Sequence, residues 1–211
     1  MKVNILPESL KNWFLKLLTP IVDYFISHNL NPNWFTTIGF ILSVGTTYLF
    51  AVGELRLAGV FVLLAGIFDI IDGRVARATN RVTKFGALYD STLDRYSEVF
   101  VFFGLAYFFV NIDPDALWRP VAVAVALGGS MMVSYIRARA EGLNLDCKVG
   151  LMQRPERVVS LGVGALISQE VLTWVIIAIA ILANFTAIQR LHHVWITENG
   201  NKREPLAATQ K

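Results

Sequence analysis

Long apolar segments constrain this chain more than any other feature, because they need a lipid bilayer as their solvent. A hydrocarbon core of ~30 Å takes about 20 mainly apolar residues to cross as a helix. The 211 residues are 55% hydrophobic and 17% charged, whereas soluble domains have about 45–50% and about 25%. We therefore predict an all-α integral membrane protein with six transmembrane helices. The predicted spans are Phe35–Val52, Leu57–Ala78, Gly86–Val110, Trp118–Arg139, Pro155–Ser168 and Val171–Leu191.

A further helix is predicted before the first span. In Ser9–His28, apolar residues recur at helical spacing, but two lysines, an aspartate and a proline interrupt them. This pattern favours an amphipathic helix lying in the membrane interface, with a seventh span as the weaker alternative. We expect one membrane domain over residues 1–196, with the interfacial helix at 1–30, the six spans at 33–193 and a mobile polar tail at 197–211.

Basic residues gather on one side of the predicted spans. Nearly all lysines and arginines lie in the N-terminal segment, the loop after Ala78, the loop from Arg137 to Arg157 and the C-terminal tail. The positive-inside rule places that side in the cytoplasm. We therefore attribute the net charge of +3 to topology and to contact with anionic lipid headgroups, and expect no nucleic-acid partner. The expected location is the cell membrane, with the active site facing the cytoplasm. The single cysteine, Cys147, excludes an intrachain disulfide framework.

Four aspartates interrupt the cytoplasmic ends of two spans, Asp69 and Asp72 in the second and Asp90 and Asp94 in the third. Carboxylates at membrane depth are costly and by default functional. The members of each pair are three or four residues apart and share one helix face, and the short connection makes the two helices antiparallel neighbours. Converging carboxylates repel each other unless cations lie between them. Ligation by oxygen alone favours Mg²⁺ or Mn²⁺ over zinc, and four carboxylates can bridge two such ions.

The same aspartates are compatible with two other roles. The acids could pair with the arginines near them, which are Arg74, Arg77, Arg81 and Arg95. They could also form the midplane site of a cation transporter or channel. Neither role explains Gly73 and Gly86, which flank the acids. A glycine in a helix costs about 1 kcal/mol relative to alanine. A glycine at these positions can leave space for a ligand close to the backbone, or it can allow two helices to pack closely.

The stretch Asp69-x2-Asp72-Gly73-x2-Ala76-Arg77-x8-Gly86-x3-Asp90-x3-Asp94 resembles the full signature of the CDP-alcohol phosphotransferase family. Aspartate-rich prenyltransferases lack its glycine and Ala-Arg elements. The resemblance implies a phospholipid-synthesising transferase with six transmembrane helices. Such an enzyme moves a phosphatidyl group, or its ether-lipid equivalent, from a CDP-lipid such as CDP-diacylglycerol to an alcohol and releases CMP. It also implies a homodimer surrounded by membrane lipids.

Residue roles follow from the same resemblance. It implies Asp69, Asp72 and Asp90 as ligands of two Mg²⁺ or Mn²⁺ ions, and Asp94 as both a further ligand and the general base. Arg77 and the ions would offset the charge of the pyrophosphate, while Asp94 takes the proton of the acceptor hydroxyl. The residues expected to contact the CDP-lipid are Asn33, Trp34, Phe35, Thr36, Gly73, Ala76, Arg77, Thr83 and Gly86.

Arginines in and beside one predicted cytoplasmic loop indicate what the acceptor carries. Guanidinium groups bind phosphate in bidentate fashion, so we expect an acceptor with a phosphate group. The arginines expected to bind it are Arg137, Arg154, Arg157 and Arg190. Segments Ser134–Gly142 and Arg154–Arg157 are similar to those of prokaryotic phosphatidylinositol-phosphate synthases and their archaeal ether-lipid counterparts. This similarity implies inositol 1-phosphate as the acceptor, with glycerol 3-phosphate as the alternative.

Overall fold

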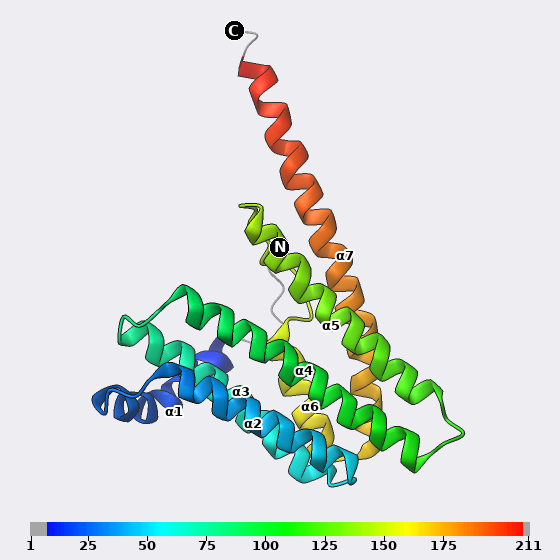
Figure 1. Cartoon of the computed structure of the whole chain (residues 1–211). Helices are drawn as coiled ribbons and strands as arrows, with labels where there is room; N and C mark the ends of the chain where they lie inside the picture. The colour runs from blue at the N-terminus through cyan, green and yellow to red at the C-terminus, as the bar shows by residue number, and fades with distance from the viewer. Residues whose placement is uncertain (1–7, 209–211) are drawn as a thin grey trace.

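The computed structural model describes residues 8–208, which fold into seven α-helices and no strand (Figure 1). The helices are α1 (Glu8–Ser27), α2 (Pro32–Ala51), α3 (Leu55–Ala78), α4 (Lys84–Ile112), α5 (Trp118–Gly142), α6 (Arg154–Ile167) and α7 (Gln169–Ala208). Each of the six predicted apolar segments falls in one of the helices α2 to α7, with the ends of the first and fifth segments displaced by one residue. The residues before Glu8, which belong to the predicted interfacial helix at 1–30, lie outside the described range.

Among the described helices, three are long and apolar enough to cross a bilayer by themselves. They are α2, α5 and the Gln169–Asn199 part of α7. Helices α3 and α4 are also long, with 24 and 29 residues, but they contain the ionisable residues of the candidate site. Helix α6 has only 14 residues, whereas a full crossing takes about 20. The described residues therefore confirm the all-helical fold and contain three candidate membrane spans.

The helices pack through apolar side chains and small residues. Helix α2 packs against α3 and α4, α5 packs against α7, and α6 contacts both α3 and α7. A buried cluster joins them, with Phe50 from α2, Phe102 from α4 and Ile176 from α7 among its members. A Cβ atom built on Gly59 of α3 would lie 2.7 Å from the carbonyl oxygen of Gly162 in α6. Only glycine permits so close an approach of the two backbones, and small residues commonly serve this purpose where membrane helices cross.

Helix α1 is fastened to α3 by one arginine. Arg74 donates from Nη1 to the carbonyl oxygen of Leu15 at 2.6 Å and from Nη2 to the hydroxyl of Thr19 at 3.1 Å. Leu18 and Val22 of α1 are buried against the bundle. The apolar residues that α1 leaves exposed are Trp13, Leu17, Ile21 and Tyr24. Helix α1 thus packs one apolar side against the bundle and exposes further apolar side chains on its outward-facing side.

The C-terminal segment is helical over most of its described length. Helix α7 continues through the predicted polar tail at 197–211 as far as Ala208 and extends well beyond the bundle (Figure 1). Polar composition does not by itself end a helix, because glutamate and lysine are good helix formers. The first proline after the apolar part of α7 is Pro205. The mobility of this segment stays a prediction, and residues 209–211 lie outside the described range.

Candidate metal and active site

A tight turn between α3 and α4 brings the aspartates together. Helix α3 ends at Ala78, and Asn80 takes a left-handed conformation with a φ of 54°. Thr83 then caps α4, its hydroxyl accepting a hydrogen bond from the backbone N–H of Gly86 at 2.9 Å. Asparagine tolerates positive φ, and threonine is a good N-cap. The short connection reverses the chain and brings carboxylates of α4 towards those of α3. The sequence predicted α3 and α4 as packed neighbours, whereas in the structure α2 is the helix that packs closely against both.

Three of the four predicted ligands converge. One carboxylate oxygen from each of Asp69, Asp72 and Asp90 lies within 4.8 Å of the other two. Asp72 is buried, and its Oδ2 accepts a hydrogen bond from the hydroxyl of Thr36 in α2 at 2.7 Å. The Oδ1 of Asp90 is buried without a hydrogen-bond partner among the described residues. A buried anionic oxygen without a donor fits a cation as its partner, and the all-carboxylate set fits a hard divalent ion.

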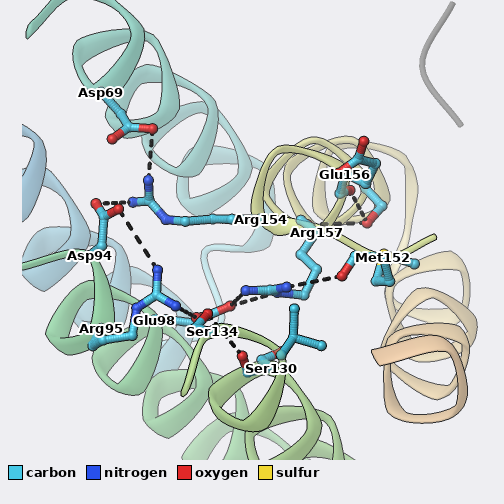
Figure 2. Close-up of polar contacts among 12 residues, drawn as sticks. Asp69, Asp94, Arg95, Glu98, Ser130, Ser134, Met152, Arg154, Glu156 and Arg157 are labelled. Atoms are coloured by element: carbon cyan, nitrogen blue, oxygen red, sulfur yellow. Dashed lines mark hydrogen bonds and ion pairs between the residues drawn. The ribbon is translucent and has the colours of Figure 1, made fainter. Parts of the chain in front are cut away.

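The fourth aspartate is linked to the cluster through an arginine from α6. Arg154 lies between α3 and α4, with Nη1 2.7 Å from Oδ2 of Asp69 and Nη2 2.6 Å from Oδ1 of Asp94 (Figure 2). Asp94 is not part of the three-residue cluster. Asp69 thus takes part both in the carboxylate cluster and in the contact with Arg154. The site combines a concentration of negative charge with one guanidinium placed directly against it.

Several predicted donor contacts lie around this cluster. The backbone at Gly86 is close to Thr83 and Asn33, because a Cβ built there would lie 3.0 Å and 3.5 Å from their side-chain oxygens. Gly73 lies beside the guanidinium of Arg77, with Nη1 3.3 Å from a Cβ built on the glycine. Arg77 itself is exposed. These positions form an open, polar surface next to the carboxylates.

The remaining predicted donor contacts have different surroundings. Trp34 is 70% exposed and projects from the start of α2. Phe35 is buried, and its ring lies 4.7 Å from that of Phe25 in α1, which is a packing role. Thr36 points to Asp72, as described above. Ala76 is half-buried on α3.

The predicted phosphate-binding arginines are spread over three helices. Arg154 is the one that contacts the aspartates. Arg137 of α5 forms an exposed ion pair with Glu141 at 2.9 Å. Arg190 of α7 is 2% exposed and donates to the backbone carbonyl oxygens of Val133 and Val149.

Arg157 has a partner that the sequence analysis did not single out. Its guanidinium lies 2.6 Å from Oε1 of Glu98 in α4, and Nη1 donates to the carbonyl oxygen of Met152 at 3.2 Å. Glu98 lies four residues after Asp94, so both carboxylates project from one face of α4. The four-residue spacing between Asp94 and Glu98 is the sequence feature that could have identified Glu98 as part of the site. Arg95 adjoins both acids, with a nitrogen 3.8 Å from Asp94 and another 3.9 Å from Glu98 (Figure 2).

A small cavity lies on the inner side of the site. Its walls come from α2, α3, α4 and α6, and its volume is about 60 Å³. Its charged lining consists of Asp69, Asp94, Glu98, Arg154 and Arg157, and the rest is mainly apolar with three hydroxyl side chains. The polar groups of α4 and α6 thus face one shared space beneath the carboxylate cluster.

Comparison with known proteins places this geometry in a family. The sequence profile of the CDP-alcohol phosphatidyltransferase family matches residues 29–197. An archaetidylinositol phosphate synthase of Methanothermobacter thermautotrophicus is 34% identical over 193 residues, covering 89% of this chain and 95% of that protein. A phosphatidylinositol phosphate synthase of Mycobacterium tuberculosis is 34% identical over 195 residues, covering 86% and 87%.

The fold agrees with solved structures of the same mycobacterial enzyme. Its crystal structure with CDP-DAG bound has a TM-score of 0.76 to this chain at 32% identity, covering 85% of this chain and 94% of that one. The structure with manganese and citrate also has a TM-score of 0.76, at 32% identity, with coverage of 84% and 88%. Together with the aspartate cluster, these matches show that the chain belongs to the CDP-alcohol phosphatidyltransferase family.

Proposed function

We propose that this enzyme transfers the phosphatidyl group of CDP-diacylglycerol, or its ether-lipid equivalent, to inositol 1-phosphate and releases CMP. The convergence of Asp69, Asp72 and Asp90 beside the Arg154–Asp94 contact carries this proposal. It brings three carboxylates close enough to share a hard cation, beside a guanidinium of the kind that binds phosphate. The 34% identity to phosphatidylinositol and archaetidylinositol phosphate synthases supports the choice of acceptor.

The proposed mechanism assigns each side chain a role. Asp69, Asp72 and Asp90 hold Mg²⁺ or Mn²⁺, with Asp94 as a further ligand and two ions in total. When bound, the ions supply positive charge that stabilises the pyrophosphate and the leaving CMP. Asp94 takes the proton from the acceptor hydroxyl, whose oxygen attacks the lipid-bearing β-phosphorus.

The donor headgroup is proposed to lie on the open surface next to the carboxylates. Arg77 offsets the charge of the CDP pyrophosphate, and Gly73 and Gly86 leave room for the headgroup to approach the backbone. Thr83, Asn33 and the other predicted positions at the start of α2 complete the donor site.

The acceptor phosphate is proposed to bind at Arg154, which is the arginine in direct contact with Asp94. Arg137 is exposed and provides a second guanidinium, while Arg157 and Arg190 contribute positive charge from their buried positions. A phosphate bound by both guanidinium nitrogens of Arg154 would compete with the carboxylates of Asp69 and Asp94 for that side chain. Asp94 would then be released from Arg154 and could approach the acceptor hydroxyl. Glycerol 3-phosphate carries the same phosphate chemistry and is the alternative acceptor.

One assay tests the activity and the acceptor together. The purified protein in detergent receives CDP-diacylglycerol, Mn²⁺ and one radiolabelled acceptor at a time, with release of CMP as the second readout. Inositol 1-phosphate should give the highest rate among inositol 1-phosphate, glycerol 3-phosphate, inositol and serine. The highest rate with glycerol 3-phosphate would replace the proposed acceptor. An absence of CMP release with every acceptor would contradict the proposed activity.

We further propose that α2 to α7 form six spans, that α1 lies in the interface, and that the site faces the cytoplasm of the cell membrane. The exposed apolar residues of α1 and the clustering of basic residues on one side support this topology. Lys148→Cys in a Cys147→Ser background should react with an impermeant maleimide only after the cells are opened. The homodimer expected from the family is proposed as well, and the mass of the complex in detergent tests it.

A further inference from the structure

A second ion pair lies one helical turn from the contact between Arg154 and Asp94. Glu98 follows Asp94 by four residues on α4, and Arg157 follows Arg154 by three on α6. The Nη2 and Nε atoms of Arg157 lie 2.6 Å and 2.7 Å from Oε1 of Glu98. The side chains of Arg157 and Glu98 are 1% and 8% exposed. Two parallel ion pairs therefore connect α4 with α6 (Figure 2).

Stability alone is a weak reason for such a pair. Taking two charges out of water carries a desolvation penalty that can exceed their attraction, and apolar residues of similar volume often serve the fold equally well. A buried ion pair does, however, fix the relative placement of the two elements that carry it. Glu98 and Arg157 therefore fix the placement of α6 relative to α4.

Arg157 fixes the backbone that leads into α6. Its Nη1 donates to the carbonyl oxygen of Met152, two residues before Arg154. The N–H of Met152 donates in turn to the hydroxyl of Thr186 in α7 at 3.0 Å. One guanidinium thus joins α4 through Glu98 to the segment that enters α6.

Arg154 depends on this arrangement because it is the first residue of α6. Gln153, at the N-cap, makes no side-chain capping hydrogen bond, although Pro155 and Glu156 in the first turn favour a helix start here. These local features start the helix but do not set its position relative to α4. A displacement of 1 Å at a substrate-positioning group can cost about 100-fold in rate. The contacts of Arg157 are therefore well placed to determine where Arg154 lies relative to Asp94.

We propose that Glu98 and Arg157 form a positioning pair that sets Arg154 against Asp94 and thereby controls binding of the acceptor phosphate. This inference rests on the proposed function of Arg154 as the acceptor-phosphate ligand. Glu98 and Arg157 are positioning residues, and neither needs to contact the substrate.

Glu98→Gln tests the proposal by a comparison of two Michaelis constants. The KM for the acceptor should rise about 10- to 100-fold, because Arg154 loses its placement. The KM for CDP-diacylglycerol should stay within about twofold of the wild-type value. Asp113→Asn is the matched control, since it breaks the ion pair of Asp113 with Arg119 elsewhere in the fold. It should change neither constant.

A double-mutant cycle separates positioning from general loss of structure. If Glu98 acts through Arg154, the effect of Glu98→Gln on the acceptor KM should largely disappear in an Arg154→Lys background. The double variant Glu98→Gln/Arg157→Met removes both buried charges and keeps similar volumes. It should recover the wild-type melting temperature in detergent and still show the raised acceptor KM.

The outcomes distinguish this proposal from the proposed function. Three results would each overturn the positioning role. The first is an equal change in the two KM values. The others are multiplicative effects of Glu98→Gln and Arg154→Lys on the acceptor KM, and recovery of the acceptor KM in the neutral double variant. All variants are measured with the acceptor that gives the wild-type enzyme its highest rate. Wild-type protein that releases no CMP with any acceptor would count against the proposed function. If Glu98→Gln alone does not fold, the neutral double variant supplies the KM comparison.

Discussion

The hydrogen bond between Thr36 and Asp72 should contribute directly to metal affinity. Thr36→Val keeps the shape of a β-branched side chain and removes the hydroxyl that donates to Oδ2 of Asp72 at 2.7 Å. Both residues are buried, with 8% and 5% exposure, so water has little access to replace the lost donor. A hydrogen bond to a charged group contributes about 1.5–3 kcal/mol. Since about 1.4 kcal/mol is tenfold in a binding constant, Mn²⁺ affinity should fall about 10- to 100-fold.

Titration of Mn²⁺ into purified protein, followed by electron paramagnetic resonance, measures this affinity without reference to turnover. The Mn²⁺ concentration that half-saturates CMP release should shift by a similar factor. Thr36→Ser keeps the hydroxyl and should retain most of the affinity. Thr46→Val is the matched control, because Thr46 is also buried and donates only within its own helix, to Leu42. Unchanged Mn²⁺ affinity with a raised donor KM would refute this reasoning and leave Thr36 as a donor contact.

Three further changes probe other parts of the molecule. Asp94→Asn should lower turnover by about 10²–10⁴-fold and leave CDP-diacylglycerol binding intact by calorimetry, since proton transfer is lost; an equal loss of binding would make Asp94 chiefly a metal ligand. Arg74→Gln removes the charged donor to Leu15 and should speed tryptic cleavage of α1, because α1 is then less firmly held; an unchanged cleavage rate would mean that apolar packing alone holds α1. Burial leaves the thiol of Cys147 0% exposed and raises its pKa, so maleimide should modify it only in unfolded protein; fast labelling of the folded protein would contradict this.

The sequence predicted three members of the carboxylate cluster from local spacing. The spacing of Asp69 and Asp72 fixes their shared helix face, and the short turn to α4 brings Asp90 alongside them. The signature positions Gly73 and Gly86 lie next to the same cluster for the same reason. Helix α2 packs against both α3 and α4 and donates from Thr36 to Asp72, and local spacing does not reveal that packing.

The arginines could be chosen from the sequence, but their partners could not. Arg154 lies 60 residues after Asp94 in the chain, and only the packing of α6 against α3 brings it to the carboxylates. Arg157 and Arg190 were expected to face a substrate, yet both are buried and bonded to groups of the protein. The sequence does not distinguish an arginine that binds a ligand from one that forms buried hydrogen bonds within the protein.

The shortness of α6 follows from the depth of the site. Asp69 lies nine residues before the end of α3, and Asp94 lies ten residues after the start of α4. At 1.5 Å per residue, both carboxylates are about 14–15 Å from those helix ends. Because Arg154 is the first residue of α6, this helix begins beside carboxylates that lie well inside their own helices. A helix of full span length would start nearer the surface and would place another residue at this depth.

The segment that leads into α6 is non-helical and partly buried, with Val149 to Leu151 half-buried and Met152 buried, so its backbone needs hydrogen-bond partners. Non-helical backbone at membrane depth is tolerated only where protein or water satisfies its polar groups. Arg190 donates to the carbonyl oxygen of Val149 at 2.8 Å, and Arg157 donates to that of Met152. Each of these buried arginines therefore stabilises the segment that precedes Arg154. The same arginines that the sequence marked as phosphate ligands are, in the fold, what allows a loop to bring Arg154 to the aspartates.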